Sequence, residues 1–256
     1  MQFARCARDG GFWCVMDGDR LAAIDGDPTG DWKRTGETFS LDGFEYAEPL
    51  ERSSVRQMII VGWNYAEHTR ETGSNLPPAP MIYPLSSAAL NTHKGAVVVP
   101  GSIRHVEHEA ELVVVIGKEA KNVKAADALD YVLGVTCGND VSARDIQNNP
   151  GFPNLPRAKT VDTFKPVGPY LTTGIDFSDL PISITVNGET RQQARTSDMI
   201  FKTPELIEFI SQTITLYPWD IIFTGTPKGC TRVYPDDEMA VTIEGVGTLI
   251  NKVVAE

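Results

Sequence analysis

Two glutamates and an aspartate stand at the ends of apolar segments, where their carboxylates could bind a cation. Glu109 and Glu111 lead into the run Leu112 to Ile116, and Asp140 follows the apolar segment 133–137. Residues two apart in a strand point to the same face, so the glutamates would stand side by side and repel each other without a positive charge between them. Three carboxylates without a thiol or imidazole at matching spacing suit Mg2+, Mn2+ or Ca2+. From the residues alone, an equally good interpretation is that Glu109 and Glu111 lie on the solvent-exposed face of an edge strand and bind no metal.

A histidine and a glutamate form a second candidate pair. His68 and Glu71 are three residues apart, so on a helix they share a face. A carboxylate behind an imidazole orients it, and the imidazole can then take a proton from water. The alternative is an exposed helical ion pair, worth about 0.3–0.5 kcal/mol.

Composition and charge limit the classes of partner. The chain has 256 residues, 41% of them hydrophobic and 22% charged, as in an ordinary globular protein of one or two domains. A net charge of -11 and a pI of about 4.9 argue against nucleic acid and anionic membranes as partners. There is no apolar run of about 18 residues, no signal-peptide core, and no CxxC among the four cysteines. We therefore expect a cytoplasmic protein with reduced thiols and without nucleic-acid or membrane partners.

The first part of the chain differs from the rest in composition and in hydrophobic pattern. Residues 12–16 and 20–24 flank a polar turn and predict a β-hairpin. Residues 25–54 are loosely patterned and rich in Gly, Asp and Glu. We expect a small N-terminal β-rich lobe over residues 1–54 and a main domain over 55–256.

The main domain reads as many short strands with few helices. Asn187-Gly188 predicts a tight hairpin, because it supplies the positive φ angles of a type I′ turn. Thr203 is the expected N-cap of the best helix, with Pro204 as its first residue. Helices are also expected over 63–71 and 125–131, and strands over 57–62, 96–99, 109–117, 133–139, 168–173, 182–186, 189–194 and 220–224. A closing hairpin is expected over 240–253. The pattern predicts a mostly β, α+β fold with a rolled or barrel-like sheet.

Seven motifs follow one another in a fixed order between about residues 59 and 253. They lie at 62–68, 109–112, 139–147, 159–164, 187–192, 224–227 and 243–251. Their sequences are GWNYAEH, EAEL, NDVSARDIQ, KTVDTF, NGETRQ, TGTP and IEGVGTLIN. In this order they resemble the fumarylacetoacetate hydrolase family. Residues 1–55 resemble the poorly defined N-terminal extension of many short, acylpyruvase-like bacterial members.

The resemblance implies a β-roll-like catalytic fold that is usually dimeric, so we expect a homodimer. It also implies that Glu109, Glu111 and Asp140 hold a divalent metal, most often Mg2+ or Mn2+, although Ca2+ also suits the ligands. Family substrates are small 2-oxo acids or their enols, which chelate the metal through a carboxylate oxygen and the 2-keto oxygen. The metal would act as a Lewis acid and stabilise the enolate that forms.

The motifs also assign catalytic roles by resemblance. Lys159 would lie beside the metal and hydrogen-bond the substrate carboxylate or developing enolate; the alternative is an ordinary surface lysine. The His68 and Glu71 spacing resembles members that cleave carbon–carbon bonds, with His68 as general base and Glu71 as its orienting group. Their position between Gly62 and Gly73 resembles a lid that orders over substrate.

Four further residues are candidates for substrate binding. The resemblance implies that Arg144 and Gln147 reach the distal part of the substrate, although Arg144 could equally pair with Asp140 or Asp145 for structure. Thr226 resembles the position that holds the substrate carboxylate, and its alternative role is that of a turn former. Tyr65 would help to close the lid or would simply pack.

One position departs from the family pattern. Many members have a lysine before a proline after the lid loop, where this chain has Tyr83 before Pro84. The lost positive charge puts a second anionic group on the substrate in doubt. It leaves the exact substrate open.

The sequence therefore predicts a metal-dependent hydrolase that cleaves a C–C bond in an acylpyruvate-like or fumarylacetoacetate-like diketo acid. The same enolate chemistry fits an isomerase of a 2-hydroxyhepta-2,4-diene-1,7-dioate or 5-carboxymethyl-2-hydroxymuconate type, or an oxaloacetate decarboxylase. A non-catalytic ligand-binding relative is the remaining alternative, since a fold alone does not prove function.

Overall fold

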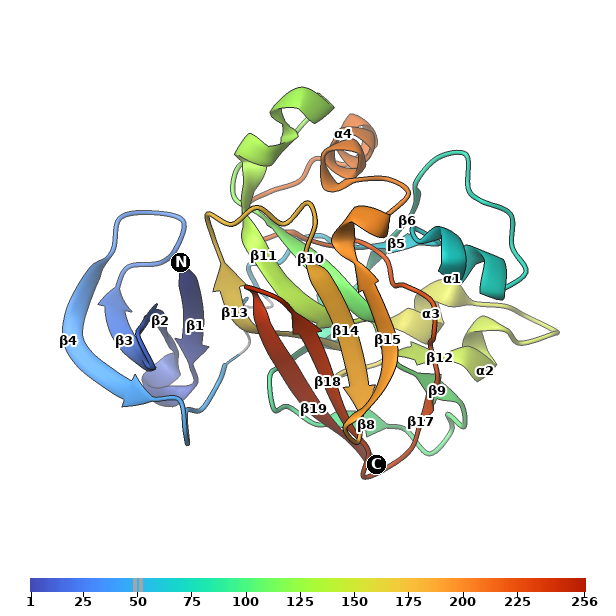
Figure 1. The fold of residues 1–256 in the computed structure, drawn as a ribbon, viewed down its shortest axis with the longest axis horizontal. Helices are drawn as coiled ribbons and strands as arrows, with labels where there is room; N and C mark the ends of the chain where they lie inside the picture. Colours follow the sequence, from blue (N-terminus) through green and yellow to red (C-terminus); the bar gives the residue numbers. More distant parts are fainter. Residues whose placement is uncertain (48–49, 51–52) are drawn as a thin grey trace.

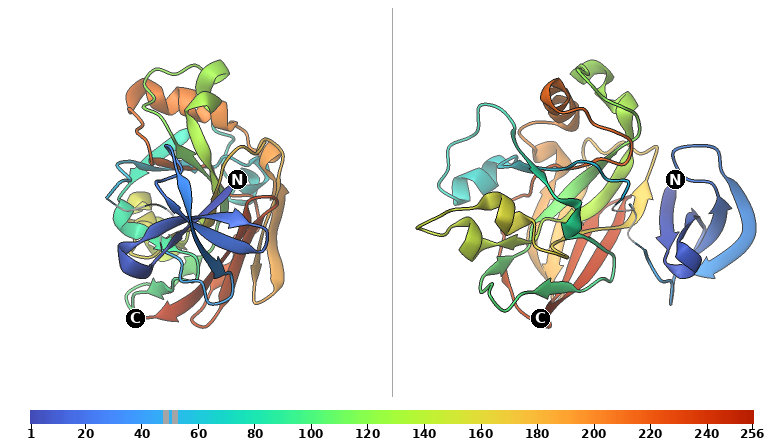
Figure 2. Two further views of the ribbon diagram at one scale, coloured as in Figure 1. Left: turned by 90° about the vertical axis from the view of Figure 1, so that its left-hand side faces the viewer. Right: turned by 180° about the vertical axis from the view of Figure 1, so that it is seen from behind.

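The computed structural model describes residues 1–47, 50 and 53–256. Residues 48, 49, 51 and 52, at the end of the segment expected to be loosely patterned, lie outside the described residues. A small lobe of strands, coloured blue in Figure 1, lies beside a larger body of sheets, coloured from cyan to red. Figure 2 shows the same separation from two further sides.

The lobe is a strand meander that contains the predicted hairpin. Its elements are β1 (Gln2–Cys6), η1 (Arg8–Gly10), β2 (Phe12–Asp17), β3 (Arg20–Asp25) and β4 (Lys33–Ser40). Strand β4 lies in the loosely patterned stretch of the expected β-rich lobe, where the sequence predicts no individual strand. This edge strand is exposed along almost its whole length, which leaves no apolar alternation for the sequence to show.

The lobe joins the main body through the largest sheet. Strand order in that sheet is β4-β3-β2-β1-β13-β11-β10-β16-β5-β6, and β7 pairs with β13. Its main-body strands are β5 (Met58–Gly62), β6 (Met81–Leu85), β7 (Leu90–Thr92), β10 (Ala110–Ile116), β11 (Val132–Asn139), β13 (Lys165–Thr172) and β16 (Ile221–Phe223). The protein is mostly β, as predicted, but this sheet stays open between β4 and β6, so the sheets do not close into a barrel.

Two smaller sheets complete the body. One has the order β15-β14-β18-β19-β8, formed by β8 (Val97–Val99), β14 (Pro181–Val186), β15 (Glu189–Arg195), β18 (Glu238–Ile243) and β19 (Gly247–Ala255). The other has the order β12-β9-β17, formed by β9 (Val106–Glu107), β12 (Ser142–Ala143) and β17 (Arg232–Val233). Asn187 and Gly188 both have positive φ in the turn between β14 and β15, as the predicted hairpin requires.

The helices are short. They are α1 (Ala66–Glu71), η2 (Ser87–Ala89), η3 (Ala125–Tyr131), α2 (Arg144–Gln147), α3 (Leu155–Lys159), η4 (Thr196–Asp198) and α4 (Thr203–Thr213). Helix α1 begins later than predicted, because Trp63 has a φ of 50° and cannot be helical. No helix in the described part of the chain is long and apolar enough to cross a membrane.

The start of α4 differs by one residue from the prediction. Lys202 rather than Thr203 is the N-cap, and Pro204 is the second helical residue. The cause is Glu205, whose Oε2 accepts the backbone N–H of Lys202 at 2.7 Å. This carboxylate satisfies a backbone donor that a helix start would otherwise leave free.

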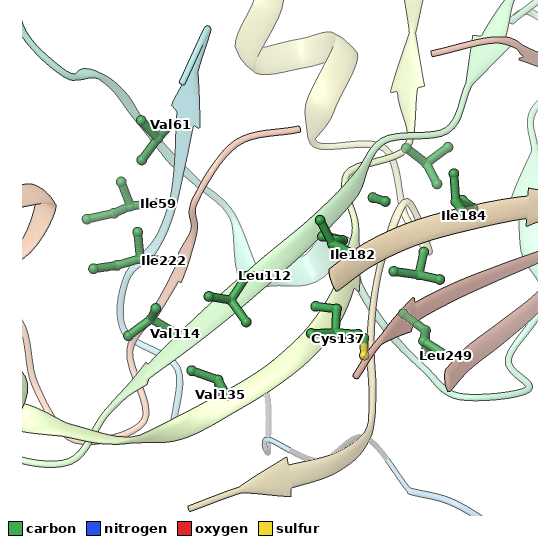
Figure 3. Packing of buried hydrophobic residues seen from close by; sticks show 14 of the residues in the cluster. Ile59, Val61, Leu112, Val114, Val135, Cys137, Ile182, Ile184, Ile222 and Leu249 are labelled. Carbon is green, nitrogen blue, oxygen red and sulfur yellow. The ribbon is translucent and has the colours of Figure 1, made fainter. Parts of the chain in front are cut away.

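Strand β10 runs through the middle of the core and is buried on both faces. Its neighbours are β11 on one side and β16 on the other. Leu112 and Val114 face the cluster between the large sheet and the five-stranded sheet, which Figure 3 shows with Ile182 and Leu249 opposite. Val113 faces a second cluster, on the side of the N-terminal lobe. Glu111 lies in this buried strand and Glu109 directly precedes it, so the strand holds both residues in place.

A buried histidine near the lobe should make stability depend on pH. The His93 ring packs edge-on against Tyr46 of the lobe at 4.7 Å, and its Nδ1 accepts the N–H of Ile250 at 3.1 Å. Burial, helped by the nearby charge of Lys94, lowers the pKa of His93 to about 4. Between about pH 6.5 and 4 the unfolded chain binds a proton that the folded protein does not, so stability falls as pH falls through this window.

Urea unfolding of the wild type and His93→Gln, at pH 7 and pH 5 in EDTA, tests this pH dependence. The wild type should lose more stability between the two pH values than the variant, by up to about 1 kcal/mol per pH unit. An equal loss in wild type and His93→Gln would show that His93 is not buried in the neutral form.

Candidate active site

The three predicted metal ligands lie together at the paired ends of two strands. Antiparallel pairing sets Ala110 of β10 opposite Asn139 of β11, so Glu109 and Asp140 are neighbours, and the Asp140 N–H donates to the Glu109 carbonyl at 2.9 Å. Carboxylate oxygens of Glu109, Glu111 and Asp140 lie within 4.8 Å of one another. All three side chains are buried, which excludes an exposed edge strand.

Two buried lysines hold the cluster from one side. Lys159, at the end of α3, donates to Glu109 Oε2 at 2.7 Å and to Asp140 Oδ2 at 2.8 Å. Lys165 Nζ lies 2.7 Å from Asp140 Oδ1 and donates to the Val141 carbonyl at 2.9 Å. Burial opposes the charge of Lys159, but the carboxylates of Asp140 and Glu109 outweigh it and raise its pKa. Lys165 was missed by sequence reasoning, and its only signal was a lysine opening a buried strand.

Glu111 lacks such a partner. Its Oε2 accepts the N–H of Gly225 at 2.7 Å, and within the described residues it forms no ion pair. Burial, and then the charges of Asp140 and Glu109, raise the pKa of Glu111 well above its usual value. Gly225 has a φ of 101°, and a Cβ there would lie 2.7 Å from the Cβ of Asn64, so glycine lets this N–H reach the carboxylate.

The residues fit a hard divalent cation. The cluster offers carboxylate oxygens from a buried position, and such oxygens are the ligands that Mg2+ and Mn2+ take. The like-charge repulsion at Glu111 would be relieved by a cation between it and its neighbours. Glu109, Glu111 and Asp140 are therefore the residues that would hold the metal.

Arg144 pairs with residues other than those weighed from the sequence. Its Nε donates to Glu107 Oε2 at 2.7 Å, and its terminal nitrogens donate to Glu109 Oε1 and Gln147 Oε1, both at 2.6 Å. Asp145 instead accepts the backbone N–H of Arg104 at 2.9 Å. The carboxylates raise the pKa of the buried Arg144, despite the opposing effect of burial. The guanidinium therefore holds Glu109 in place, and it also lines the cavity together with Gln147.

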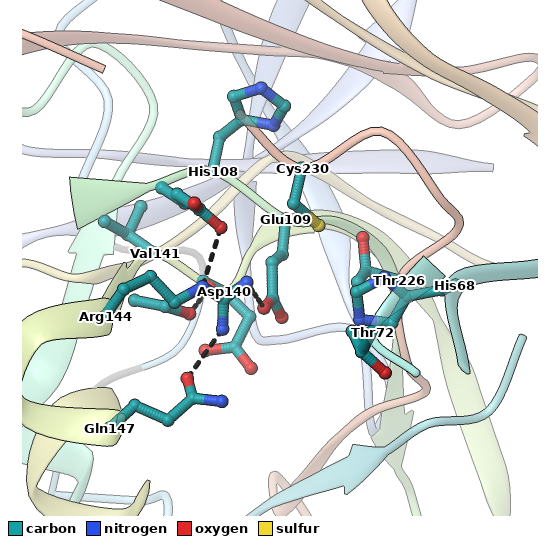
Figure 4. A network of polar contacts seen from close by, with 12 residues as sticks. His68, Thr72, His108, Glu109, Asp140, Val141, Arg144, Gln147, Thr226 and Cys230 are labelled. Carbon is teal, nitrogen blue, oxygen red and sulfur yellow. Dashed lines mark hydrogen bonds and ion pairs between the residues drawn. The ribbon is translucent and has the colours of Figure 1, made fainter. Parts of the chain in front are cut away.

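His68 and Glu71 form the predicted pair on α1. His68 Nδ1 lies 2.7 Å from Glu71 Oε1, and the histidine side chain is only 11% exposed. The backbone N–H of Gly229 donates to both Glu71 oxygens, at 3.1 and 3.2 Å. With Nδ1 donating to Glu71, Nε2 is left to accept a proton. Figure 4 shows His68 and Thr226 across Glu109 from Arg144 and Gln147.

These side chains share one cavity of about 660 Å³. Of the ten predicted site residues, nine line it: His68, Glu71, Glu109, Glu111, Asp140, Arg144, Gln147, Lys159 and Thr226. The Thr226 hydroxyl accepts from Gln192 Nε2 at 2.8 Å. His105, Glu107 and Cys230 also line the cavity, although sequence reasoning did not select them. These three residues lie outside the seven motifs, and their spacing in the sequence predicts no shared site.

Two tyrosines singled out from the sequence lie outside this lining. Tyr65 is buried in the main hydrophobic cluster, and its hydroxyl has no hydrogen-bond partner among the described residues. Burial, together with the charge of Glu111, raises the pKa of Tyr65. Tyr83, where the family resemblance predicts a lysine, packs with the hydrophobic cluster on the lobe side of β10.

Comparisons with known proteins match most of the chain. A family model described as fumarylacetoacetate hydrolase, C-terminal, matches residues 57–254, and one described as Rv2993c-like, N-terminal, matches residues 1–45. The chain is 41% identical to the 4-hydroxyphenylacetate degradation bifunctional isomerase/decarboxylase of Salmonella dublin, over 80% of this chain and 48% of that protein. It is 42% identical to the mitochondrial oxaloacetate tautomerase Fahd2a of Rattus norvegicus, over 77% of this chain and 66% of that one.

Solved structures extend the similarity to the fold. The 2-hydroxyhepta-2,4-diene-1,7-dioate isomerase of Mycobacterium marinum is 36% identical, with a TM-score of 0.90, over 100% of this chain and 99% of that one. The fumarylpyruvate hydrolase of Pseudomonas aeruginosa, solved with Mn2+ and pyruvate, is 30% identical, with a TM-score of 0.74, over 79% of this chain and 91% of that one.

Proposed function

The chain belongs to the fumarylacetoacetate hydrolase family, and on this premise we propose that it is a hydrolase dependent on Mg2+ or Mn2+. Its substrate is a small 2-oxo acid of the acylpyruvate type, in which it cleaves a C–C bond. The single observation that carries this proposal is the His68 and Glu71 pair in the same cavity as the three carboxylates. A proton acceptor beside a candidate metal site is what hydrolysis by activated water needs.

In the proposed hydrolysis, His68 and Glu71 activate water. His68, oriented by Glu71, takes a proton from water, and the water oxygen attacks the distal carbonyl carbon of the substrate. The bond between that carbon and C3 of the pyruvate portion then breaks. Its electron pair leaves with pyruvate as the enolate, which takes up a proton to give pyruvate, while the acyl portion leaves as a carboxylic acid. A bound divalent ion supplies Lewis-acid stabilisation of negative charge on the 2-oxo oxygen.

Lys159 and Thr226 bind the substrate. Two N–H donors of Lys159 go to Glu109 and Asp140, which leaves the third for a substrate carboxylate or enolate oxygen. Thr226 is buried and still lines the cavity, so its hydroxyl is placed to donate to the substrate carboxylate. Arg144 and Gln147 lie on the opposite side of Glu109 from Thr226 (Figure 4). In this proposal they contact the distal part of the substrate.

The proposal predicts that turnover depends on metal. Acetylpyruvate, fumarylpyruvate and oxaloacetate are offered with Mg2+, Mn2+ or EDTA, and pyruvate release is measured. We expect pyruvate from at least one acylpyruvate with metal and a loss of at least about 1,000-fold in EDTA, since a Lewis acid contributes several kcal/mol. Full turnover in EDTA, or no pyruvate from either acylpyruvate, would contradict the hydrolase.

An isomerase is the second candidate, because a close structural relative carries that name and a curated relative is named a bifunctional isomerase/decarboxylase. A proton shift through the same enolate needs no attack by water. Loss of dienoate absorbance with metal, without pyruvate release from an acylpyruvate, would favour this candidate.

We also propose a homodimer, which light scattering on the purified protein tests.

A further inference from the structure

A second group of metal-ligating atoms lies beside the carboxylate cluster. The Cys230 Sγ, a ring nitrogen of His68 and a carboxylate oxygen of Glu109 lie within 4.8 Å of one another. All three residues line the cavity, and Figure 4 shows the sulfur of Cys230 directed between Glu109 and Thr226. Thiolate, imidazole and carboxylate together are ligands for a thiophilic ion, whereas the first cluster offers only oxygen.

We propose that His68, Glu109 and Cys230 form a second metal site, selective for a thiophilic divalent ion such as Zn2+, and that an ion bound there inhibits the enzyme. Ligand atoms of tetrahedral zinc lie about 3.5 Å apart, given bonds of about 2.0 Å to nitrogen and 2.3 Å to sulfur. Atoms already within 4.8 Å of one another need only small side-chain rotations to reach that arrangement. On binding, the Cys230 thiol gives its proton to solvent and the thiolate bonds to the ion.

The surroundings are those of a metal-binding histidine. A histidine ligand usually gives its other ring N–H to a carboxylate, and His68 Nδ1 lies 2.7 Å from Glu71. Glu71 is fixed in turn by the N–H of Gly229, the residue next to Cys230. On the other side, Gln192 Nε2 lies 3.5 Å from Cys230 Sγ, while its shorter hydrogen bonds go to Thr226 Oγ1 at 2.8 Å and to the Pro227 carbonyl at 2.6 Å. The outer contact of the histidine ligand is thus already in place.

The inhibitory effect rests on the proposed function. An ion on Nε2 of His68 occupies the lone pair that would accept the proton from water. Water activation would then stop even while the carboxylate cluster holds its own ion. Glu109 connects the two sites, because its carboxylate belongs to both groups.

Cobalt spectroscopy tests the site without any assay of activity. Co2+ is added to EDTA-stripped wild type, Cys230→Ala and Cys6→Ala, and the thiolate-to-cobalt charge-transfer band is recorded in the near ultraviolet. Cys6 is buried in the N-terminal lobe, far along the chain from the site, and serves as the matched control. The wild type and Cys6→Ala should show the band and Cys230→Ala should lack it. No band in the wild type, or a band that persists in Cys230→Ala, overturns the site.

Zinc titration of the Mg2+-supported activity tests the inhibition. Each protein is normalised to its own activity without zinc, and the zinc concentration for half inhibition should rise at least about tenfold in Cys230→Ala, because a strong ligand is lost. Equal inhibition in both proteins would place zinc at the oxygen site and overturn the proposal. A cobalt band with no turnover of any substrate would instead count against the proposed function alone.

Discussion

Replacing Glu111 by glutamine should abolish metal-dependent turnover and yet stabilise the metal-free protein. Glu111 is buried beside Asp140 and Glu109, its pKa is raised, and the described residues offer it no ion pair. A neutral amide of the same size removes the repulsion and keeps an oxygen for the Gly225 N–H. We expect about 1 kcal/mol more stability in EDTA, together with a loss of at least about 1,000-fold in kcat/KM.

Glu109→Gln is the contrasting variant. Its carboxylate pairs with both Lys159 and Arg144, at 2.7 and 2.6 Å. Its loss therefore removes one carboxylate from each of two buried cations, which leaves Lys159 only Asp140 and Arg144 only Glu107 as ion-pair partners among the described residues. Removing one member of a buried ion pair costs about 3–5 kcal/mol. The two variants should therefore lose activity alike but move stability in opposite directions.

Urea unfolding in EDTA and Mn2+ titration by calorimetry measure the two effects separately. Mn2+ binding should be lost or strongly weakened in both variants. If Glu111→Gln were destabilised as much as Glu109→Gln, the negative charge of Glu111 would have a stabilising partner as well, which would contradict the prediction. Unchanged Mn2+ affinity in Glu111→Gln would remove Glu111 from the ligands.

The sequence predicted the parts of the fold and site that local pattern encodes. The run from Leu112 to Ile116 is apolar because β10 is buried on both faces, and Asn187-Gly188 marks its turn through backbone conformation alone. Glu109 and Glu111 were placed together by the two-residue period of a strand. These features need no knowledge of distant segments.

What the sequence did not show depends on contacts across the fold. Arg144 pairs with Glu107, 37 residues earlier, and no spacing rule relates the two. Lys165 meets Asp140 only because β13 lies beside β11. Cys230 reaches the cavity from the segment before β17, with no motif to mark it. Strand β4 is polar and exposed, so its sequence has no alternation of apolar residues. The strand forms because it pairs with β3, which the sequence of β4 alone does not show.

Replacing His68 by alanine should slow hydrolysis of an acylpyruvate far more than decarboxylation of oxaloacetate. A positioned general base contributes roughly 100-fold to 10,000-fold, and only hydrolysis needs a proton taken from water. The loss in kcat should therefore reach this range with acetylpyruvate and stay below about tenfold with oxaloacetate, where carbon dioxide leaves without water attack. Both rates are measured at saturating Mg2+, so that a change in metal affinity does not enter.

Glu71→Gln separates orientation from proton transfer. Glutamine can still accept a hydrogen bond from His68 Nδ1, but it does not stabilise the charged imidazolium that forms as the proton arrives. Its hydrolysis rate should fall between those of wild type and His68→Ala, again with little change for oxaloacetate. Equal losses in both reactions would mean that His68 acts in the enolate step that they share, and an isomerase would then use the same histidine to move a substrate proton. The ratio of the two rates therefore distinguishes water activation from proton shuttling at a single cavity.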